Sequence, residues 1–301
     1  MTAMAHTKII THKKKMIAAG YLFITPWLLG FFCFTVFPMI ASLYFSFTKY
    51  DMLTPPIWNG IKNYTDMMSD SKFTNSLSVT MRYVFLSVPL QLAFALLVAV
   101  IFKKNRPGVK VYRAVYYLPS LFGGSIAVAV LWRNIFNRNG MLNQILATFG
   151  IKGQNWISEP GTALYTLIIL AVWQFGASMV IFLASLKQIS NDYYEAATID
   201  GAGKVRQFFQ ITLPLLTPMV FFNVVMQFIN AFQSFTPAYI VSGGTGAPLD
   251  STLFYTLNLY IQAFTRFKMG YASALAWVLL VIIGAFTGLV FVSANKWVYY
   301  D

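Results

Sequence analysis

Amide and hydroxyl side chains recur inside two long apolar stretches of the sequence. In residues 162–186, Gln174 and Ser178 lie four positions apart and therefore share one face of a helix. In residues 214–241, polar residues recur at helical spacing, with one further amide at the edge of the stripe: Asn223, Gln227, Asn230, Ser234 and Gln233. Amides donate and accept hydrogen bonds, which suits a path for a hydroxyl-rich solute. The alternative is that these groups only join neighbouring helices within a membrane.

Aromatic side chains accompany the second polar stripe. Phe228 and Phe232 lie four residues apart on the adjoining helix face, where they could stack on a sugar ring. The alternative for these two side chains is packing against other helices or against lipid.

Catalytic and metal-binding constellations are not apparent in the sequence. Both histidines lie in the polar N-terminal tail, the single cysteine lies in an apolar run, and no two carboxylates share a plausible pocket. Residues 201–204, Gly-Ala-Gly-Lys, resemble the end of a phosphate-binding loop. However, Thr198 stands where that motif needs glycine, and Val205 stands where it needs serine or threonine. We therefore expect no enzyme activity, no nucleotide hydrolysis and no metal site on this chain.

The composition is that of a membrane protein. Hydrophobic residues make up 57% of the 301 residues and charged residues only 10%, against about 25% charged in a soluble domain. The mean hydropathy is +0.62. Six apolar stretches are long enough for a bilayer, which needs about 20 helical residues: 16–47, 73–102, 114–136, 162–186, 214–241 and 269–294. Residues 253–264 are amphipathic and are expected at the membrane interface.

The positive charge predicts the orientation. Six spans place both termini on one side, which also holds thirteen of the 22 basic residues in short segments: Lys8, Lys13, Lys14, Lys15, Lys103, Lys104, Arg106, Lys110, Arg113, Lys187, Lys204, Arg206 and Lys296. The positive-inside rule therefore makes both termini cytoplasmic, including a basic tail over residues 1–15. The net charge of +13 then reflects topology, and a nucleic-acid partner is not expected.

The segment 194–218 connects two of the apolar stretches and is the most polar and glycine-rich part of the second half. Its run 195–197, Glu-Ala-Ala, is expected to open a short helix, and Gly201 is expected to end it. A second amphipathic turn, 205–211, leads to Pro214, which suits the first turn of the next span. The sequence therefore predicts a helix–turn–helix elbow, exposed for docking on another protein.

The spacing in this elbow closely resembles the EAA loop of binding-protein-dependent ABC importer permeases, most of all their sugar-uptake branch of maltose, glycerol-phosphate and multiple-sugar types. The matching residues are Glu195, Ala196, Ala197, Asp200, Gly201, Ile211, Leu213 and Pro214. The resemblance extends over nearly the whole chain, for example to Trp58, Gly60, Asn63 and Tyr64 in the first external loop. One departure is residues 243–248, Gly-Gly-Thr-Gly-Ala-Pro, where the family usually has Gly-Gly-Pro. The contacts of that loop with a binding protein therefore stay open.

The resemblance implies an all-α type I ABC importer transmembrane domain over residues 16–301, with six transmembrane helices. The EAA loop, about 190–213, would be the coupling helix that docks on a separate ATPase through Glu195, Ala196, Ala197, Asp200 and Gly201. The implied partners are a second homologous permease subunit in a heterodimer, two ATPase subunits and an extracytoplasmic solute-binding protein, in a bacterial or archaeal cytoplasmic membrane. ATP and Mg would bind the ATPase, so no cofactor is expected on this chain.

In maltose-type permeases the residues of the sugar site come from the fourth and fifth spans. Six residues of this chain fall at or near the matching positions: Trp173, Gln174, Phe175, Ser178, Asn230 and Gln233. Together with Gln227 of the polar stripe, they are the seven substrate-path residues expected here. The resulting prediction is a permease subunit that imports a sugar or oligosaccharide. The alternative is an ion-coupled secondary transporter for a small polar solute, which the scarcity of carboxylates in the spans disfavours.

Overall fold

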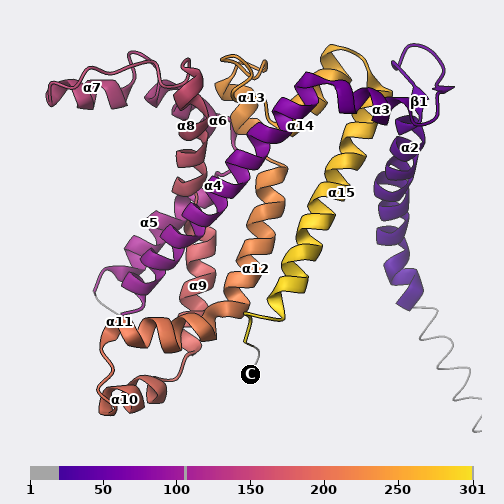
Figure 1. Ribbon diagram of the computed structural model, residues 1–301. Coiled ribbons are helices and arrows are strands. Elements are labelled where there is room, and N and C mark those ends of the chain that lie inside the picture. The colour runs from indigo at the N-terminus through magenta and orange to yellow at the C-terminus, as the bar shows by residue number, and fades with distance from the viewer. Residues whose placement is uncertain (1–19, 105–106, 300–301) are drawn as a thin grey trace, which may run out of the picture.

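The computed structural model describes residues 20–104 and 107–299 of the chain, which are almost entirely helical (Figure 1). Among these residues, five helices are long and apolar enough to cross a membrane, and the number is six if a bent pair of shorter helices is counted as one broken span. This agrees with the six spans predicted. The basic tail predicted over residues 1–15 lies outside the described residues.

The helix α4 (Ser71–Phe102) lies at the centre of the bundle, and its diagonal path is visible in Figure 1. Small residues such as Ala95 and Ala99 are fully buried on it and allow close approach of other helices. The helices packed against it are α8 (Pro160–Trp173), α9 (Gly176–Gln188), α12 (Leu213–Phe232) and α14 (Tyr255–Tyr260). The first span, Gly20–Ser46, instead packs through α2 (Phe37–Ser46) on α15 (Met269–Ala294).

The third span is broken and not continuous over residues 114–136. It consists of α5 (Val109–Leu121) and α6 (Ile126–Ile135), which are bent by 99° relative to each other. Two glycines fall in the break, and Ser125 then caps α6 by accepting the N–H of Ala127 at 3.2 Å. The apolar composition continues through the break, so hydropathy alone predicted one helix.

Two other spans contain breaks. The fourth is interrupted at Gln174 and Phe175, between α8 and α9. The fifth is interrupted at residues 233–235, between α12 and α13 (Thr236–Val241).

The fifth span begins earlier than predicted, because the helix starts at Lys204 and Pro214 lies inside it. It runs from α11 (Lys204–Gln207) through the π-helical turn η2 (Phe208–Thr212) into α12. In η2 the N–H of Leu213 donates to the carbonyl of Phe208, five residues earlier. This wider turn accommodates a proline that cannot donate a hydrogen bond to the preceding turn.

The two ends of the bundle differ (Figure 1). At one end, α10 (Asn191–Ile199) and α11 form the elbow, on the same side as the end of α15. The opposite end carries the short sheet of β1 (Thr48–Lys49) and β2 (Ile57–Trp58), which pair antiparallel. The remaining helices at that end are α3 (Lys62–Ser69), α7 (Met141–Thr148) and α13.

Residues 253–264, predicted to lie at the membrane interface, pack against other parts of the protein through α14 and the following η3 (Ile261–Thr265). Tyr255 and Leu257 are buried, and the Tyr255 hydroxyl donates to the carbonyl of Leu275 at 2.8 Å. The polar side of the segment also faces protein, since Asn258 Nδ2 donates to Ser76 Oγ at 3.3 Å. The polar side of the amphipathic pattern therefore finds partners within the protein.

Candidate solute cavity and docking elbow

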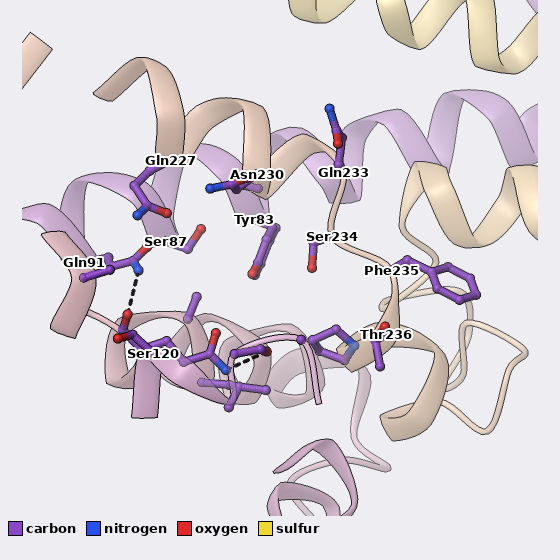
Figure 2. A pocket seen from close by; sticks show the side chains of 18 residues that line it. Tyr83, Ser87, Gln91, Ser120, Gln227, Asn230, Gln233, Ser234, Phe235 and Thr236 are labelled. Atoms are coloured by element: carbon purple, nitrogen blue, oxygen red, sulfur yellow. Dashed lines mark hydrogen bonds between the residues drawn. The ribbon is translucent and has the colours of Figure 1, made fainter. Parts of the chain in front are cut away.

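The three helix breaks line one cavity of about 440 Å³ beside α4 (Figure 2). Gly123 and Gly124 come from the break in the third span, Gln174 from the fourth, and residues 233–235 from the fifth. Non-helical backbone at membrane depth is tolerated where it is buried in protein or lines a cavity. Breaks of this kind also form solute sites in transporters. The position of the three breaks therefore marks this cavity as the candidate site.

Amide side chains connect the breaks of the third and fourth spans to each other and to α4. Gln174 Nε2 donates to the carbonyl oxygen of Gly123 at 3.0 Å, and Gln91 Nε2 donates to the carbonyl oxygen of Gln174 at 3.3 Å. Backbone carbonyls that the broken helices leave free thus find side-chain partners.

Four of the seven substrate-path residues expected from the sequence line this cavity: Gln174, Gln227, Asn230 and Gln233. Asn230 and Gln233 are exposed, which leaves their amides accessible. In Figure 2 the amide of Gln233 is directed away from the group formed by Tyr83, Ser87 and Asn230.

Ser178 lies outside the lining and joins two helices. It is fully buried on α9, and its hydroxyl accepts a hydrogen bond from Gln227 Nε2 of α12 at 3.0 Å. The amide of Asn223, from the same polar stripe, donates to the carbonyl of Met219 within its own helix at 2.9 Å. The polar stripe therefore divides into residues that line the cavity and residues that bond to protein.

The aromatic residues expected near the path are packed elsewhere. Trp173 lies against Trp132, with ring centroids 5.6 Å apart. Phe175 is buried and meets Phe94 edge-on, at 4.7 Å between centroids. Phe228 and Phe232 are buried too, and both contact Phe286. None of these four rings lines the cavity.

A polar stripe on α4 contributes to the cavity and was missed from the sequence. Tyr83, Ser87 and Gln91 recur every four residues and all line it. The Ser87 hydroxyl is buried and has no hydrogen-bond partner in the described part of the chain, so its hydrogen-bonding capacity is unused. The regular spacing was visible in the sequence, whereas the facing residues Ser120 and Thr236 could be found only from the structure.

The lining carries no charged side chain. Of the residues described, those at the cavity include no aspartate, glutamate, lysine, arginine or histidine. The cavity therefore presents hydroxyl and amide groups, which exchange hydrogen bonds with a neutral polar molecule without leaving an ion unpaired.

The elbow has the predicted helix–turn–helix form, although its first helix begins earlier than expected. Ser190 caps α10 by accepting the N–H of Asp192 at 3.3 Å, so Glu195 lies in mid-helix and not in the first turn. Gly201 ends the helix in the left-handed region, at φ +75°, and the N–H of Ala202 donates to the carbonyl of Ala197 at 2.8 Å. The cap at Ser190 was an available sequence signal.

Side-chain hydrogen bonds hold the two elbow helices together. Gln207 is buried and donates to Thr198 Oγ1 at 2.9 Å and to the carbonyl of Ala202 at 3.0 Å. The hydroxyls of Tyr194 and Thr212 form a hydrogen bond of 2.9 Å. The elbow is thereby connected rigidly to the base of α12.

The outer face of the elbow is exposed and partly apolar. Glu195, Ala196 and Asp200 are exposed, while Ala197 is half-buried. Large apolar side chains beside them are also open, with Ile199 at 87% and Val205 at 73% exposure. The outer face therefore combines exposed charged side chains with exposed apolar ones.

Comparison with known proteins gives a consistent picture. Residues 64–298 match the family described as binding-protein-dependent transport system inner membrane component. A probable ABC transporter permease protein, YesP of Bacillus subtilis, is 54% identical over 94% of this chain and 92% of its own length. The lactose transport system permease protein LacF of Rhizobium radiobacter is 30% identical over 97% of this chain and 99% of its own length. The trehalose/maltose transport system permease protein MalF of Thermococcus litoralis is 31% identical over 89% of this chain and 90% of its own length.

Solved structures share the fold. A chain of a bacterial alginate ABC transporter, in complex with an alginate pentasaccharide-bound periplasmic protein, aligns with a TM-score of 0.82. The alignment covers 95% of this chain and 96% of that one, at 18% sequence identity.

Proposed function

This chain belongs to the family of inner membrane components of binding-protein-dependent transport systems, and from that premise we propose that it imports a sugar or oligosaccharide as one permease subunit of an ABC transporter. It is a transporter subunit and not an enzyme. The names of its relatives, which include lactose and trehalose/maltose permeases, support a saccharide as the solute.

The uncharged cavity at the three helix breaks is the observation that carries the proposal. Its volume of about 440 Å³ falls within the range of about 300–1,000 Å³ usual for small-molecule sites. Asn230, Gln227 and the free hydroxyl of Ser87 supply donors and acceptors to a neutral saccharide. An acidic sugar stays compatible with the proposal if a second permease supplies the compensating charge.

The exposed elbow supports the proposed partners. Glu195, Ala196, Ala197, Asp200 and Gly201 would dock on a separate ATPase subunit, which binds ATP and Mg. Two such ATPases would serve a heterodimer of this chain with a second homologous permease, and a solute-binding protein would deliver the sugar from outside. In this arrangement both termini and the elbow are cytoplasmic. Docking in the ATP-bound state would draw the elbows together and open the cavity outward.

The ion-coupled alternative is not favoured. Family membership points to coupling through a partner ATPase, and no carboxylate that could carry a coupling proton or sodium lines the cavity among the described residues.

Two measurements test the proposal. The tagged chain, purified from its native membrane, should bring with it an ATPase and a second permease. Uptake by cells with and without the gene should differ for a neutral oligosaccharide, and not for amino acids or phosphate esters. Recovery of the chain without an ATPase would contradict the permease assignment, whereas gene-dependent uptake of an amino acid would contradict only the saccharide assignment.

A further inference from the structure

A second and larger cavity, of about 710 Å³, lies at the end of the bundle opposite the elbow. One wall is the loop of β1, β2 and α3, and the other is the turn at residues 266–268 that leads into α15. It shares no lining residue with the cavity at the helix breaks.

The walls of this second cavity are held firmly. The N–H of Gly270 donates to the carbonyl of Tyr50 at 3.0 Å, and a Cβ at Gly270 would lie only 2.1 Å from the carbonyl oxygen of Thr48. Asn63 is buried and its amide donates to the carbonyls of Ser46 and Thr48 at 2.8 and 2.9 Å. The cavity is therefore a built feature and not a gap between mobile loops.

Three of the four basic residues that line the cavity have no carboxylate partner among the residues described. Lys49, Arg266 and Lys268 form no ion pair there, whereas Lys62 is paired with Asp66 at 3.1 Å. Unpaired cations on the walls of a concave site favour an anionic ligand.

The carboxylates at the cavity are already engaged by the protein. Asp70 accepts the N–H of Lys72 at 2.8 Å and the hydroxyl of Tyr271 at 2.8 Å. Asp51 accepts the N–H and the hydroxyl of Thr54, both at 2.8 Å, and these hydrogen bonds lower the pKa of the Asp51 carboxyl. Asp51 and Asp70 are thus held by neutral donors and Asp66 by Lys62, so none of the three forms an ion pair with Lys49, Arg266 or Lys268; with four basic and three acidic side chains, the lining keeps a net charge of +1.

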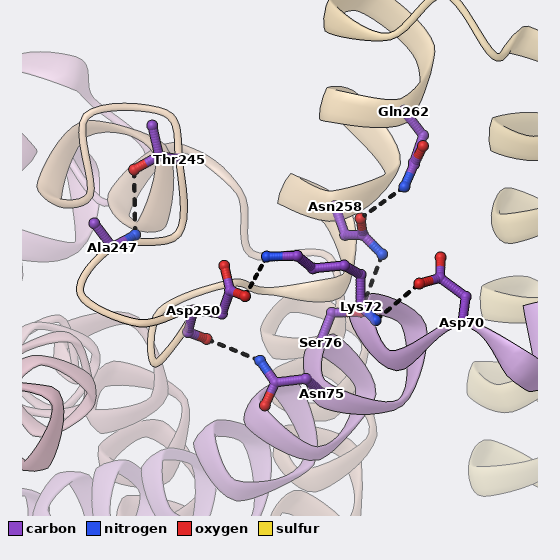
Figure 3. Close-up of polar contacts among 9 residues, drawn as sticks. All are labelled: Asp70, Lys72, Asn75, Ser76, Thr245, Ala247, Asp250, Asn258 and Gln262. Atoms are coloured by element: carbon purple, nitrogen blue, oxygen red, sulfur yellow. Dashed lines mark hydrogen bonds and ion pairs between the residues drawn. The ribbon is translucent and has the colours of Figure 1, made fainter.

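A buried amide faces the cavity with an unused acceptor. Gln262 is 2% exposed; its Nε2 donates to Asn258 Oδ1 at 3.4 Å, and Asn258 donates in turn to Ser76 (Figure 3). Gln262 is one of the residues that line the cavity, and its buried Oε1 has no hydrogen-bond partner in the described part of the chain. A buried acceptor without a donor is costly, by about 1–3 kcal/mol. The site therefore calls for a ligand with a hydroxyl or N–H donor as well as a negative charge.

The cavity lies beside the ends of three of the long apolar helices. It follows the end of α2, precedes α4 and adjoins the first turn of α15. Beside it, Trp58 is 61% exposed and stacks on Phe47, and aromatic side chains of this kind occupy the membrane–water interface. Phe267, at the cavity itself, is 51% exposed and offers an apolar surface to an acyl chain.

We propose that this second cavity binds the headgroup of an anionic glycerophospholipid that carries a hydroxyl group, of the phosphatidylglycerol type. The phosphate lies against Lys49, Arg266 and Lys268 through charge-assisted hydrogen bonds, and the headgroup hydroxyl donates to Gln262 Oε1. A choline headgroup has no such donor and no net charge. A transported saccharide is a poorer fit, because the cavity is separate from the candidate solute path.

Lipid titration of the purified full chain in a neutral detergent tests this site. Phosphatidylglycerol should raise the midpoint of thermal unfolding, and native mass spectrometry should detect a retained lipid. Phosphatidylcholine and soluble glycerol 1-phosphate should do neither, which separates a lipid from a free phosphate ligand. In Arg266→Gln/Lys268→Gln the apparent affinity for phosphatidylglycerol should fall about tenfold, as expected for loss of charge-assisted hydrogen bonds.

The matched control is Arg138→Gln/Lys152→Gln, which removes two exposed cations from another loop outside the cavity. The control should keep the wild-type affinity, and both double variants should unfold at the wild-type temperature without lipid. Equal stabilisation by phosphatidylcholine, stabilisation by glycerol 1-phosphate alone, or equal loss of affinity in the two double variants would overturn the proposal.

Discussion

The side chain of Gln174 donates a hydrogen bond to the backbone carbonyl of Gly123 at 3.0 Å and thereby joins the breaks of two different membrane spans. Both residues line the candidate solute cavity. The contact gives one residue two tasks, because Gln174 positions the lining and also forms part of it. A solute that competes for this amide would also loosen the connection between the third and fourth spans.

Replacement of Gln174 by leucine should therefore impair both stability and uptake. The variant leaves the Gly123 carbonyl without its donor, which should lower the free energy of unfolding by about 1–3 kcal/mol. Thermal unfolding in detergent and uptake of a labelled saccharide measure the two effects. Gln144→Leu is the control, because Gln144 lies on α7, away from the cavity, and its amide makes an exposed hydrogen bond to the carbonyl of Asn139. Equal behaviour of the two variants would contradict a structural role for the Gln174–Gly123 bond.

Much of the fold could be predicted from the sequence, because a long apolar stretch in a membrane has few structures open to it other than a spanning helix. The sixth span, Met269–Ala294, has the bounds predicted. In the third span, Gly123 and Gly124 were a local signal that hydropathy did not use. The break in the fourth span was not accessible, since Gln174 is a single polar residue between apolar runs and its partner Gly123 lies 51 positions away. A helix break stabilised by such a distant contact leaves no local signal.

Part of the candidate site could also be predicted from the sequence. Polar residues in spans are rare enough to stand out, so Asn230 and Gln227 were found. Periodicity identifies a shared helix face but not what that face meets. Periodicity therefore could not distinguish Gln227, which lines the cavity, from Ser178, which is buried and hydrogen-bonded to Gln227. The second cavity joins loops some 200 residues apart, as the contact of Gly270 with Tyr50 illustrates, and had no sequence signal.

The elbow provides a test of coupling. Gly201→Asp places a side chain where the backbone is left-handed, at φ +75°, which costs about 1 kcal/mol or more. Glu195→Lys reverses an exposed charge on α10. Both variants should reach the membrane yet lose saccharide uptake and co-purification of the ATPase. Gly203→Asp is the matched control, because Gly203 is the N-cap of α11 at φ −69°, where aspartate is favoured. Full uptake and ATPase association in Glu195→Lys and Gly201→Asp would refute the coupling role.

The orientation of the chain is open to thiol labelling in intact cells. In a Cys33→Ala background, cysteine at Ser69 or Leu249 should react with an impermeant reagent, because both residues are exposed at the end opposite the elbow. Leu249 is 88% exposed. Cysteine at Asp200 in the elbow should react only after the membrane is permeabilised. Labelling of Asp200→Cys in intact cells, with protection of the other two, would mean that the charge distribution had been interpreted in the wrong direction.

The cavity lining gives the most direct test of what crosses the membrane. Asn230 and Gln233 are exposed at the cavity and carry neutral amides that hydrogen-bond to a saccharide. Asn230→Leu and Gln233→Leu should each reduce uptake by about three- to tenfold, as expected for one lost hydrogen bond to a solute hydroxyl. The reduction should be larger for Asn230, since the Gln233 amide is directed away from the neighbouring polar groups (Figure 2).

Asn223→Leu is the control, because Asn223 lies two turns earlier on the same helix and its amide donates to a backbone carbonyl of that helix. Co-purification of the ATPase should be normal in all three variants, which separates a solute-binding defect from failed assembly. If Asn223→Leu impaired uptake as much as Asn230→Leu, the polar stripe would serve helix packing and the cavity would lose its assignment as the solute path.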